Sequence, residues 1–234
     1  MMSDDFRRTL ELPQVHAVLN GDAQERGGTF LVLVLGGRPP AGEWLRHIAK
    51  GCEVWAVDRG ADVCRGADVI PRRFMGDPDT VSEAGRAWME RERIPAELCA
   101  ADEKRSAIQV ALERARGDGI VTGCWGGNFD HAVANAFCTD EGGARVVCLG
   151  DEHELFFPLL GKENLRLSNM SMPLTISLLP MLDAAVGVSV EGSPWSMENT
   201  DVPLSRPWVI NDMPFGEDLI VSLAEGALGV YTIF

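Results

Sequence analysis

Residues 29–150 alternate between short apolar runs and longer segments whose apolar residues recur with a helical period. The apolar runs are bounded by Gly, Asp or Pro and predict strands of a sheet covered on both faces. Segments 81–93 and 104–116 predict helices. Because strands and helices alternate, we expect an α/β domain with a mostly parallel sheet flanked by helices. The expected strands are 29–37, 52–58, 72–77, 97–102, 119–124 and 144–151.

The second predicted helix has a single apolar stripe at positions i, i+3, i+4 and i+7. The stripe consists of Ile108, Ala111, Leu112 and Ala115. One stripe of this width predicts that the helix buries one face against the sheet and leaves the other in solvent.

The helical period disappears after residue 152. Short apolar or alternating segments spaced by Gly, Pro, Asn and Asp follow, and they predict a small, sandwich-like all-β domain. The sequence therefore predicts an α/β domain over residues 1–151 and an all-β domain over residues 152–234. Residues 1–28 are polar with a weak apolar pattern, and we expect an extra helix or hairpin packed on the first domain.

Composition narrows the class of partner. With 234 residues, 46% of them hydrophobic, the chain is long enough to bury a core. A formal net charge of −14 and no stripe of Lys or Arg argue against nucleic acid and anionic membranes as partners. If the ligand is a phosphate ester, an acidic protein must screen its own carboxylates, which favours a divalent cation.

The six cysteines are scattered, with no CxxC pair, and are expected to be buried thiols in a reducing compartment. Residues 1–14 lack the apolar core of a signal peptide, and no stretch approaches the roughly 20 apolar residues of a membrane span. We therefore expect a cytoplasmic protein.

Polar clusters follow the predicted strands of the α/β domain. In an open parallel sheet, ligands bind outside the carboxyl ends of the strands, so these clusters are expected to share one rim. The clusters are Gly36-Gly37, Asp58 to Gly60, Gly76 to Asp79, Asp102-Glu103 and Gly123 to Asp130.

Asp77 and Asp79 place two carboxylates in one turn. Their mutual repulsion is relieved if a cation lies between them, and hard oxygen ligands favour Mg²⁺ or Mn²⁺. The alternative is that Asp-Pro-Asp is turn chemistry only, because both residue types favour turns. The local sequence does not decide between the two.

The segment from Gly123 to Asn135 is rich in glycine and leads into a predicted helix. Glycines allow a tight turn and a close approach to a ligand, and free N–H groups at the helix start can hold a phosphate. Two alternatives favour a purely structural role. Asp130 can be a capping carboxylate, and His131 with Asn135, four residues apart, can be a polar pair that faces the neighbouring domain.

Taken together and in this order, the motifs resemble those of the thiamine pyrophosphokinase (thiamine diphosphokinase) family. The resemblance covers the chain from about residue 30 to its end. Its motifs are Asp58-Arg59-Gly60-Ala61, Gly76-Asp77-Pro78-Asp79-Thr80, Gly126-Gly127-Asn128-Phe129-Asp130-His131 with Asn135, Ser177 to Met181, Gly192 to Met197, and Asn211.

The resemblance implies that a diphosphoryl group is transferred from ATP to the hydroxyl of thiamine, with release of AMP and with Mg²⁺ or Mn²⁺ on the phosphates. It also implies a homodimer with active sites at the subunit interface. The implied catalytic residues are Asp77, Asp79 and Asp130, and the first two are also metal ligands. The implied nucleotide and phosphate site comprises Asp58, Gly60, Gly126, Gly127, Asn128 and His131.

On the acceptor side, the resemblance implies that Trp195 and Asn211 bind thiamine. Trp195 follows a proline in a turn rich in Gly and Ser, so its ring is expected to be accessible for stacking on a cationic ligand. A tryptophan that fills the core of the β domain is the alternative.

The chain departs from the family pattern at two positions. Ser106 and Ala107 stand where the family has Thr-Asp, so the third carboxylate is missing, and Asn128 stands in place of an arginine. Glu103 lies one helical turn before Ala107, and its longer side chain is a candidate third metal ligand. Alternatively, Glu103 is a solvated residue that the helix dipole favours in the first turn.

Three functions are therefore considered from the sequence. The first is an active thiamine diphosphokinase. The second is a non-catalytic homologue that binds a nucleotide or thiamine compound. The third is a diphosphokinase for another alcohol, such as a hydroxymethyl-pterin.

Overall fold

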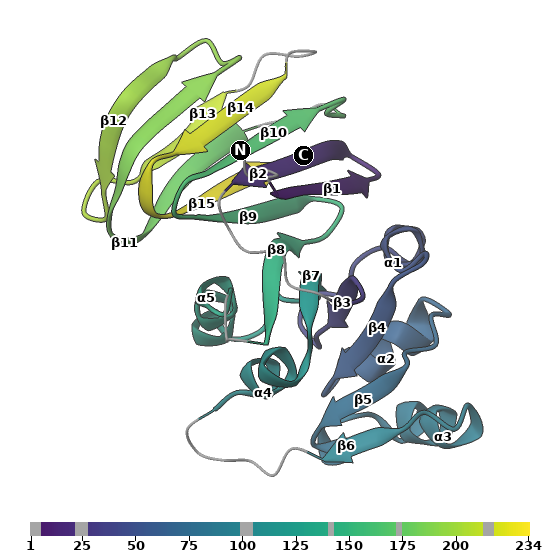
Figure 1. Ribbon diagram of the computed structural model, residues 1–234. Coiled ribbons are helices and arrows are strands. Elements are labelled where there is room, and N and C mark those ends of the chain that lie inside the picture. Colours follow the sequence, from purple (N-terminus) through teal and green to yellow (C-terminus); the bar gives the residue numbers. More distant parts are fainter. Residues whose placement is uncertain (1–5, 22–27, 99–104, 140–142, 172–174, 213–217) are drawn as a thin grey trace. The chain divides into compact units, whose positions relative to one another are not determined.

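The computed structural model describes residues 6–21, 28–98, 105–139, 143–171, 175–212 and 218–234. The chain divides into two compact units. The α/β unit comprises residues 26–151, and the β unit comprises residues 1–25 together with residues 152–234. Figure 1 shows the elements of both units.

The α/β unit contains a six-stranded sheet in which every neighbouring pair is parallel. The strand order is β8-β7-β3-β4-β5-β6. Five of the strands match predicted apolar runs, which are buried because the sheet is covered on both faces. The sixth, β6, contains only the start of the predicted strand 97–102 and is largely exposed, and residues 99–102 lie outside the described residues. Their bounds are β3 (Leu31–Val34), β4 (Glu53–Val57), β5 (Arg73–Gly76), β6 (Ala96–Leu98), β7 (Gly117–Thr122) and β8 (Ala144–Gly150).

Helices cover both faces of this sheet, with α1, α2 and α3 on one side and α4 and α5 on the other (Figure 1). The predicted stripe on α4 is buried, from Ile108 to the C-cap Ala115. No helix in the described ranges is long and apolar enough to cross a membrane. The helices are α1 (Gly42–Ile48), α2 (Gly60–Gly66), α3 (Glu83–Arg91), α4 (Ala107–Arg114) and α5 (Phe129–Phe137), with a 3₁₀ turn η1 (Pro78–Thr80).

The strand order contains one reversal of direction. From β3 the chain builds outward through β4, β5 and β6, and then returns to place β7 on the other side of β3. The loops after β3 and β7 therefore leave adjacent strands toward opposite faces of the sheet. Such a switch point opens a crevice at the carboxyl ends of the strands, where ligands bind in open α/β sheets.

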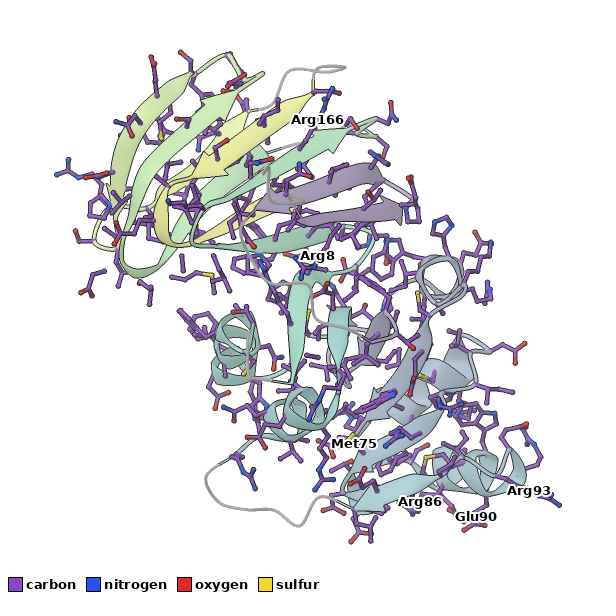
Figure 2. The ribbon with its side chains drawn as sticks, viewed as in Figure 1. Arg8, Met75, Arg86, Glu90, Arg93 and Arg166 are labelled. Carbon is purple, nitrogen blue, oxygen red and sulfur yellow. The ribbon has the colours of Figure 1, made fainter. Side chains whose placement is uncertain are left out.

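The β unit is entirely antiparallel in the described residues, in the order β1-β2-β10-β14-β11-β15-β9, and β12 and β13 also pair with β11. The guanidinium of Arg166 on β10 donates to Asp218 at 2.6 Å (Figure 2). The strands are β1 (Phe6–Leu12), β2 (Val15–Gly21), β9 (Glu154–Leu160), β10 (Glu163–Ser168), β11 (Thr175–Glu191), β12 (Met197–Pro203), β13 (Trp208–Asp212), β14 (Leu219–Leu223) and β15 (Glu225–Ile233).

The N-terminal segment corrects one prediction. Residues 1–28 were expected to pack on the α/β domain, but β1 and β2 form a hairpin whose second strand pairs with β10. The hairpin therefore extends the β unit. Leu165 and Leu19 face each other in the β2–β10 register, and both are buried, so the weak apolar pattern of the N-terminus is completed by a strand far along the chain.

Parallel pairing is also less prevalent than the sequence predicted. Of the strand pairs in the described residues, eight are antiparallel and five are parallel, so the sheet structure as a whole is mostly antiparallel. The parallel pairs are confined to residues 26–151. The predicted all-β domain is larger than expected because it includes the β1–β2 hairpin. Within it, the pairing of the 17-residue strand β11 with β15 shifts register between Pro180 and Ala185.

Candidate active site

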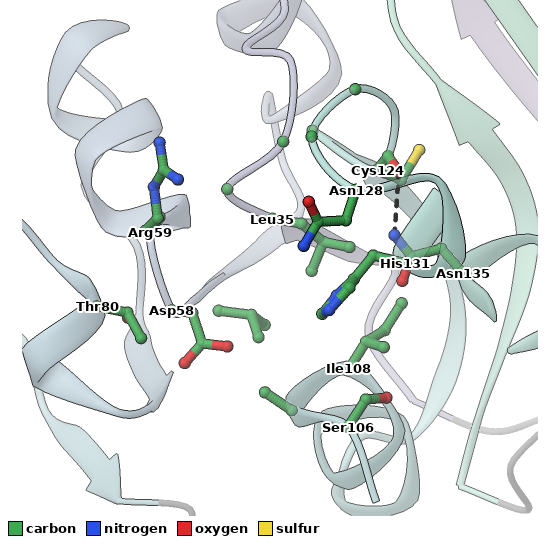
Figure 3. A pocket seen from close by; sticks show the side chains of 17 residues that line it. Leu35, Asp58, Arg59, Thr80, Ser106, Ile108, Cys124, Asn128, His131 and Asn135 are labelled. Carbon is green, nitrogen blue, oxygen red and sulfur yellow. Dashed lines mark hydrogen bonds between the residues drawn. The ribbon is translucent and has the colours of Figure 1, made fainter. Parts of the chain in front are cut away.

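A cavity of about 390 Å³ lies at the carboxyl ends of β3, β4 and β7, at the switch point of the α/β unit (Figure 3). The loops after these strands contribute Gly36, Asp58 and Gly126, and the first turns of α4 and α5 contribute Ala107 and His131. Three of the five polar clusters that follow the predicted strands therefore contribute to one cavity. The cluster Gly76 to Asp79 adjoins it through Thr80 but does not line it, and Asp102-Glu103 lies outside the described residues.

Gly37, which lines the cavity, and Gly60, which follows the lining residue Arg59, are required by close packing of the backbone. A Cβ atom on Gly60 would lie 1.8 Å from the carbonyl oxygen of Val34, and one on Gly37 would lie 2.3 Å from that of Trp125. No side chain fits at such distances. The glycines let α2 start directly above β3 and let the loop after β3 lie against the loop after β7, and this packing shapes the cavity.

Asp58 is the half-buried carboxylate of the cavity. It follows β4 with a positive φ of 51°, and its Oδ1 atom accepts a hydrogen bond from the Asp77 backbone N–H at 2.9 Å. Gly76 makes room for this contact, since a Cβ atom there would lie 2.0 Å from Asp58 Oδ1. Asp58 is drawn facing His131 across the cavity in Figure 3.

Burial raises the pKa of the Asp58 carboxyl above its ordinary value of 3.8. The hydrogen bond from the Asp77 N–H lowers the pKa, the charge of Asp77 raises it, and His131 lowers it, but burial has the largest effect. Because the pKa of Asp58 is higher in the folded state than in the unfolded state, the charged form of its carboxyl destabilises the fold relative to the neutral form.

The raised pKa gives a prediction for stability. Asp58 stabilises the fold most fully below about pH 3.8, its unfolded value, and this contribution is lost as the pH rises through the folded pKa. Asp58→Asn removes the charge and keeps the oxygen that accepts from Asp77, and Asn tolerates a positive φ. Urea unfolding between pH 3.5 and pH 7 should show the variant gaining stability relative to wild type as the pH rises. A constant difference would refute the assignment.

Asp77 and Asp79 lie in the turn after β5. Asp77 is the N-cap of η1, and its Oδ1 atom accepts from the Asp79 backbone N–H at 2.9 Å. Arg86 of α3 donates to the carbonyl oxygens of Pro78 at 3.3 Å and Val81 at 2.5 Å and so fixes the turn (Figure 2). The local fold thus supplies the turn chemistry that was the alternative to a metal site.

Both carboxylates in this turn are exposed, and of the turn residues only Thr80 lines the cavity. Asp77 nevertheless adjoins Asp58 through its backbone N–H. Among the residues that the structure describes, no group of three or more His, Cys, Asp and Glu side chains is placed to hold a metal ion. Glu103, the candidate third ligand, lies outside the described residues.

The glycine-rich loop after β7 leads into α5. Gly126 and Gly127 have φ angles of 75° and 70°, and both line the cavity with Asn128 and His131. The buried Asn135 donates from Nδ2 to the Cys124 carbonyl oxygen at 3.0 Å (Figure 3), which ties the loop to the helix. Asn135 therefore bonds to the loop rather than forming the polar pair with His131 that the spacing suggested.

Asp130 lies in the first turn of α5 and is exposed. Its Oδ1 atom accepts from the His131 backbone N–H at 2.9 Å. The N-cap of α5 is Asn128, so Asp130 contributes this contact within the first turn rather than as the cap itself. Asp130 is not among the side chains that line the cavity.

Position 107 faces the cavity, as does Ser106, the N-cap of α4. The Ser106 backbone N–H donates to Gln109 Oε1 at 2.9 Å and closes a capping box. Ala107 thus presents an uncharged methyl group to the cavity at the position where the resemblance implies a carboxylate.

Trp195 and Asn211 both lie in the β unit. Trp195 is half-buried in the turn between β11 and β12, where its indole Nε1 donates to the Asp212 carbonyl oxygen at 3.2 Å. Its ring stacks on Trp208, with ring centroids 5.9 Å apart. Asn211 lies on β13 and pairs with Ile176 of β11. Trp208 was missed by the sequence analysis because a single tryptophan in a polar segment belongs to no motif.

Comparison with solved structures shows that the chain has the fold of the thiamin pyrophosphokinases. The enzyme from Bacillus subtilis aligns over 87% of this chain and 98% of its own, with a TM-score of 0.75 and 18% identity. The enzyme from Geobacillus thermodenitrificans aligns over 88% and 97%, with a TM-score of 0.73 and 17% identity. That from Candida albicans aligns over 88% and 90%, with a TM-score of 0.69 and 15% identity.

No protein-family model matches the sequence, and the comparison with curated proteins gave no match. The likeness to the kinases is therefore a likeness of fold. What the chain does has to be argued from its own residues.

Proposed function

We propose that the protein is a thiamine diphosphokinase, which transfers the diphosphoryl group of ATP to the hydroxyl of thiamine and releases AMP. The observation that carries the proposal is the cavity at the switch point, where two glycine-rich loops lie beside the half-buried Asp58 and the exposed His131. The fold shared with thiamin pyrophosphokinases supports the same assignment.

In the proposed reaction the hydroxyl oxygen of thiamine forms a bond to the β-phosphorus of ATP. The bond from the β-phosphorus to the oxygen that bridges it to the α-phosphorus breaks, AMP leaves, and the hydroxyl proton is released. Such a step needs positioning and neutralisation of charge more than a nucleophilic side chain. Gly126 and Gly127 are assigned to the phosphates, and Asn128 and His131 to the nucleotide side of the cavity with Asp58 and Gly60.

The residues present fit a magnesium ion that arrives with its nucleotide. Mg²⁺ is usually held by only one or two protein carboxylates and completes its octahedron with water and phosphate oxygens. Asp77 and Asp79 supply two carboxylates within one fixed turn, and Asp58 lies next to Asp77. We assign Asp77 and Asp79 as the ligands, with Asp130 supporting the site. The cation would neutralise charge on the phosphates.

The test is a product analysis of the purified protein given ATP, Mg²⁺ and thiamine. We expect AMP and thiamine diphosphate to appear in equal amounts, and to disappear when the divalent cation is chelated. ADP in place of AMP would indicate transfer of a single phosphoryl group and would contradict the proposal. AMP that appears only when another alcohol replaces thiamine would reassign the acceptor.

The missing carboxylate gives a gain-of-function prediction. Ala107 faces the cavity, so Ala107→Asp should place a third carboxylate at the metal and lower the Mg²⁺ concentration for half-maximal activity by about tenfold. Ala107→Asn is the matched control, because it has a similar size and carries no charge. Equal Mg²⁺ dependence in wild type and Ala107→Asp would show that position 107 does not face the metal.

One observation favours a non-catalytic homologue as the second candidate. Ala107 and Asn128, the two departures from the family pattern, both line the cavity, so the loss of charge falls on the site itself. This candidate predicts that the chain binds ATP without producing AMP. Calorimetry with ATP beside the product analysis separates the two functions.

The expected homodimer is part of the proposal and can be tested by complementation. If one active site uses the α/β unit of one chain and the β unit of another, an Asp77→Asn chain and a Trp195→Ala chain should each have about a tenth of wild-type activity or less alone, when assayed at a thiamine concentration well below the wild-type KM. Co-expressed in equal amounts, they should recover about a quarter of wild-type activity, since random pairing gives half heterodimers, each with one intact site. No recovery would place both residues in one chain's site.

A further inference from the structure

The β unit carries an aromatic pair that the proposed function uses only in part. Trp208 begins β13 and pairs with Leu178 of β11, and its side chain is 41% exposed. The Trp195 and Trp208 rings are stacked, with 27° between their planes. Two stacked indoles present more aromatic surface than either alone, and aromatic faces attract flat and cationic rings.

Trp208, unlike Trp195, lines a cavity of about 630 Å³ formed by residues 200–203, 206–209 and 211. Asp201 and Arg206 also line this cavity, so the charged side chains at its wall include one of each sign. Size and aromatic surface suit a ligand with a heteroaromatic ring. Within the pair, Trp208 is therefore the tryptophan in contact with the space that a ligand can enter.

The amide of Asn211 is already engaged on both of its polar atoms. Its Oδ1 atom accepts from Trp208 Nε1 at 2.6 Å, and its Nδ2 atom donates to the Ile176 carbonyl oxygen at 3.3 Å. An indole N–H can only donate, so this contact fixes which end of the amide faces the ring. Asn211 thus links the Trp208 ring to strand β11.

We propose that Trp208 is the side chain that stacks on the heteroaromatic ring of the acceptor, and that Asn211 is a positioning residue acting through Trp208. The proposal rests on the proposed function, which makes thiamine, with its cationic thiazolium ring, the acceptor. Trp195 backs the Trp208 ring and keeps it from turning. The role that the resemblance gives to Asn211, direct contact with thiamine, is replaced by an indirect one.

The experiment measures thiamine affinity by calorimetry on the full chain, and KM for thiamine and for ATP where turnover is present. Trp208→Leu removes the aromatic face and should weaken thiamine binding about tenfold or more, while the KM for ATP and kcat change less than about twofold. Trp208→Phe keeps an aromatic face and loses the N–H that Asn211 orients, so it should weaken thiamine binding by no more than about threefold. Trp88→Phe, the same change at a buried position on α3, is the matched control.

A double-mutant cycle tests the positioning role. Asn211→Ala should weaken thiamine binding in the wild-type chain by about threefold, and should have no further effect in the Trp208→Phe chain, where the N–H that it orients is absent. An undiminished effect of Asn211→Ala in that background would show direct contact and overturn the positioning role. Thermal unfolding of each variant identifies losses caused by misfolding.

The remaining outcomes are also decisive. If wild type binds thiamine and both Trp208 variants bind it equally well, the stacking role is wrong and the proposed function stands. If wild type neither binds thiamine nor converts it, the proposed function and this inference fall together.

Discussion

Asp77→Asn should reduce diphosphoryl transfer by a factor of about 10²–10³, the effect expected when one group that stabilises charge in the transition state is lost. The substitution removes the carboxylate charge assigned to the metal but keeps an oxygen that can accept from the Asp79 backbone N–H. The turn after β5 should therefore persist, so the loss should appear in turnover and Mg²⁺ dependence rather than in stability. Steady-state rates over a range of Mg²⁺ concentrations measure both.

The matched control is Asp68→Asn. Asp68 is exposed and has a φ of 57°, which Asn tolerates, and it lies outside the cavity. Asp68→Asn removes one carboxylate charge from the same unit, as Asp77→Asn does, so the turnover of the Asp68→Asn variant should equal that of wild type. If Asp77→Asn also has wild-type turnover, Asp77 serves only as the cap of η1.

Gly60→Ala should destabilise the α/β unit by about 3 kcal/mol or more, at the upper end of the range for overpacked sites. The added methyl group would lie 1.8 Å from the Val34 carbonyl oxygen, and a backbone atom cannot move aside as a side chain does. Either α2 shifts away from β3 or the end of β3 is displaced, and both changes distort the loop that carries Asp58. Chemical unfolding of the variant and wild type measures the loss.

Gly66→Ala provides the control on the same helix. Gly66 is the last residue of α2, and an added Cβ atom has nothing within 4 Å. The substitution should be neutral or stabilise by up to about 1 kcal/mol, because alanine restricts the unfolded chain more than glycine does. Similar losses of stability in Gly60→Ala and Gly66→Ala would mean that α2 tolerates neither substitution. The contact with Val34 would then not be the cause of the loss in Gly60→Ala.

The α/β unit was the part of the fold that the sequence predicted best. Except for the edge strand β6, its strands are buried on both faces and have apolar sequences, and the stripe of α4 has a clear period. The seven-residue helices α1 and α2 were missed because so short a helix gives little periodicity. The β1–β2 hairpin was misplaced because its partner, β10, lies about 140 residues away, and no local pattern encodes such a pairing.

The candidate site, like the fold, could be predicted only where its features leave a local pattern in the sequence. The glycines and Asp58 could be identified because close backbone approach and strand-end carboxylates leave a local pattern. The sequence could not show that Asp77 caps η1, that Asn135 bonds to the Cys124 carbonyl, or that Trp208 stacks on Trp195. Each of these depends on an orientation or a partner that only the folded chain defines.

A crystal structure with α,β-methylene-ATP and Mn²⁺ tests the central claim most directly. The methylene group replaces the bridging oxygen of the bond that breaks in diphosphoryl transfer, so the nucleotide stays intact, and the anomalous signal of Mn²⁺ locates the cation. We predict the phosphates against Gly126 and Gly127, with Mn²⁺ bound to the carboxylates of Asp77 and Asp79. A nucleotide bound elsewhere, or a cation with no ligand from this turn, would contradict the account.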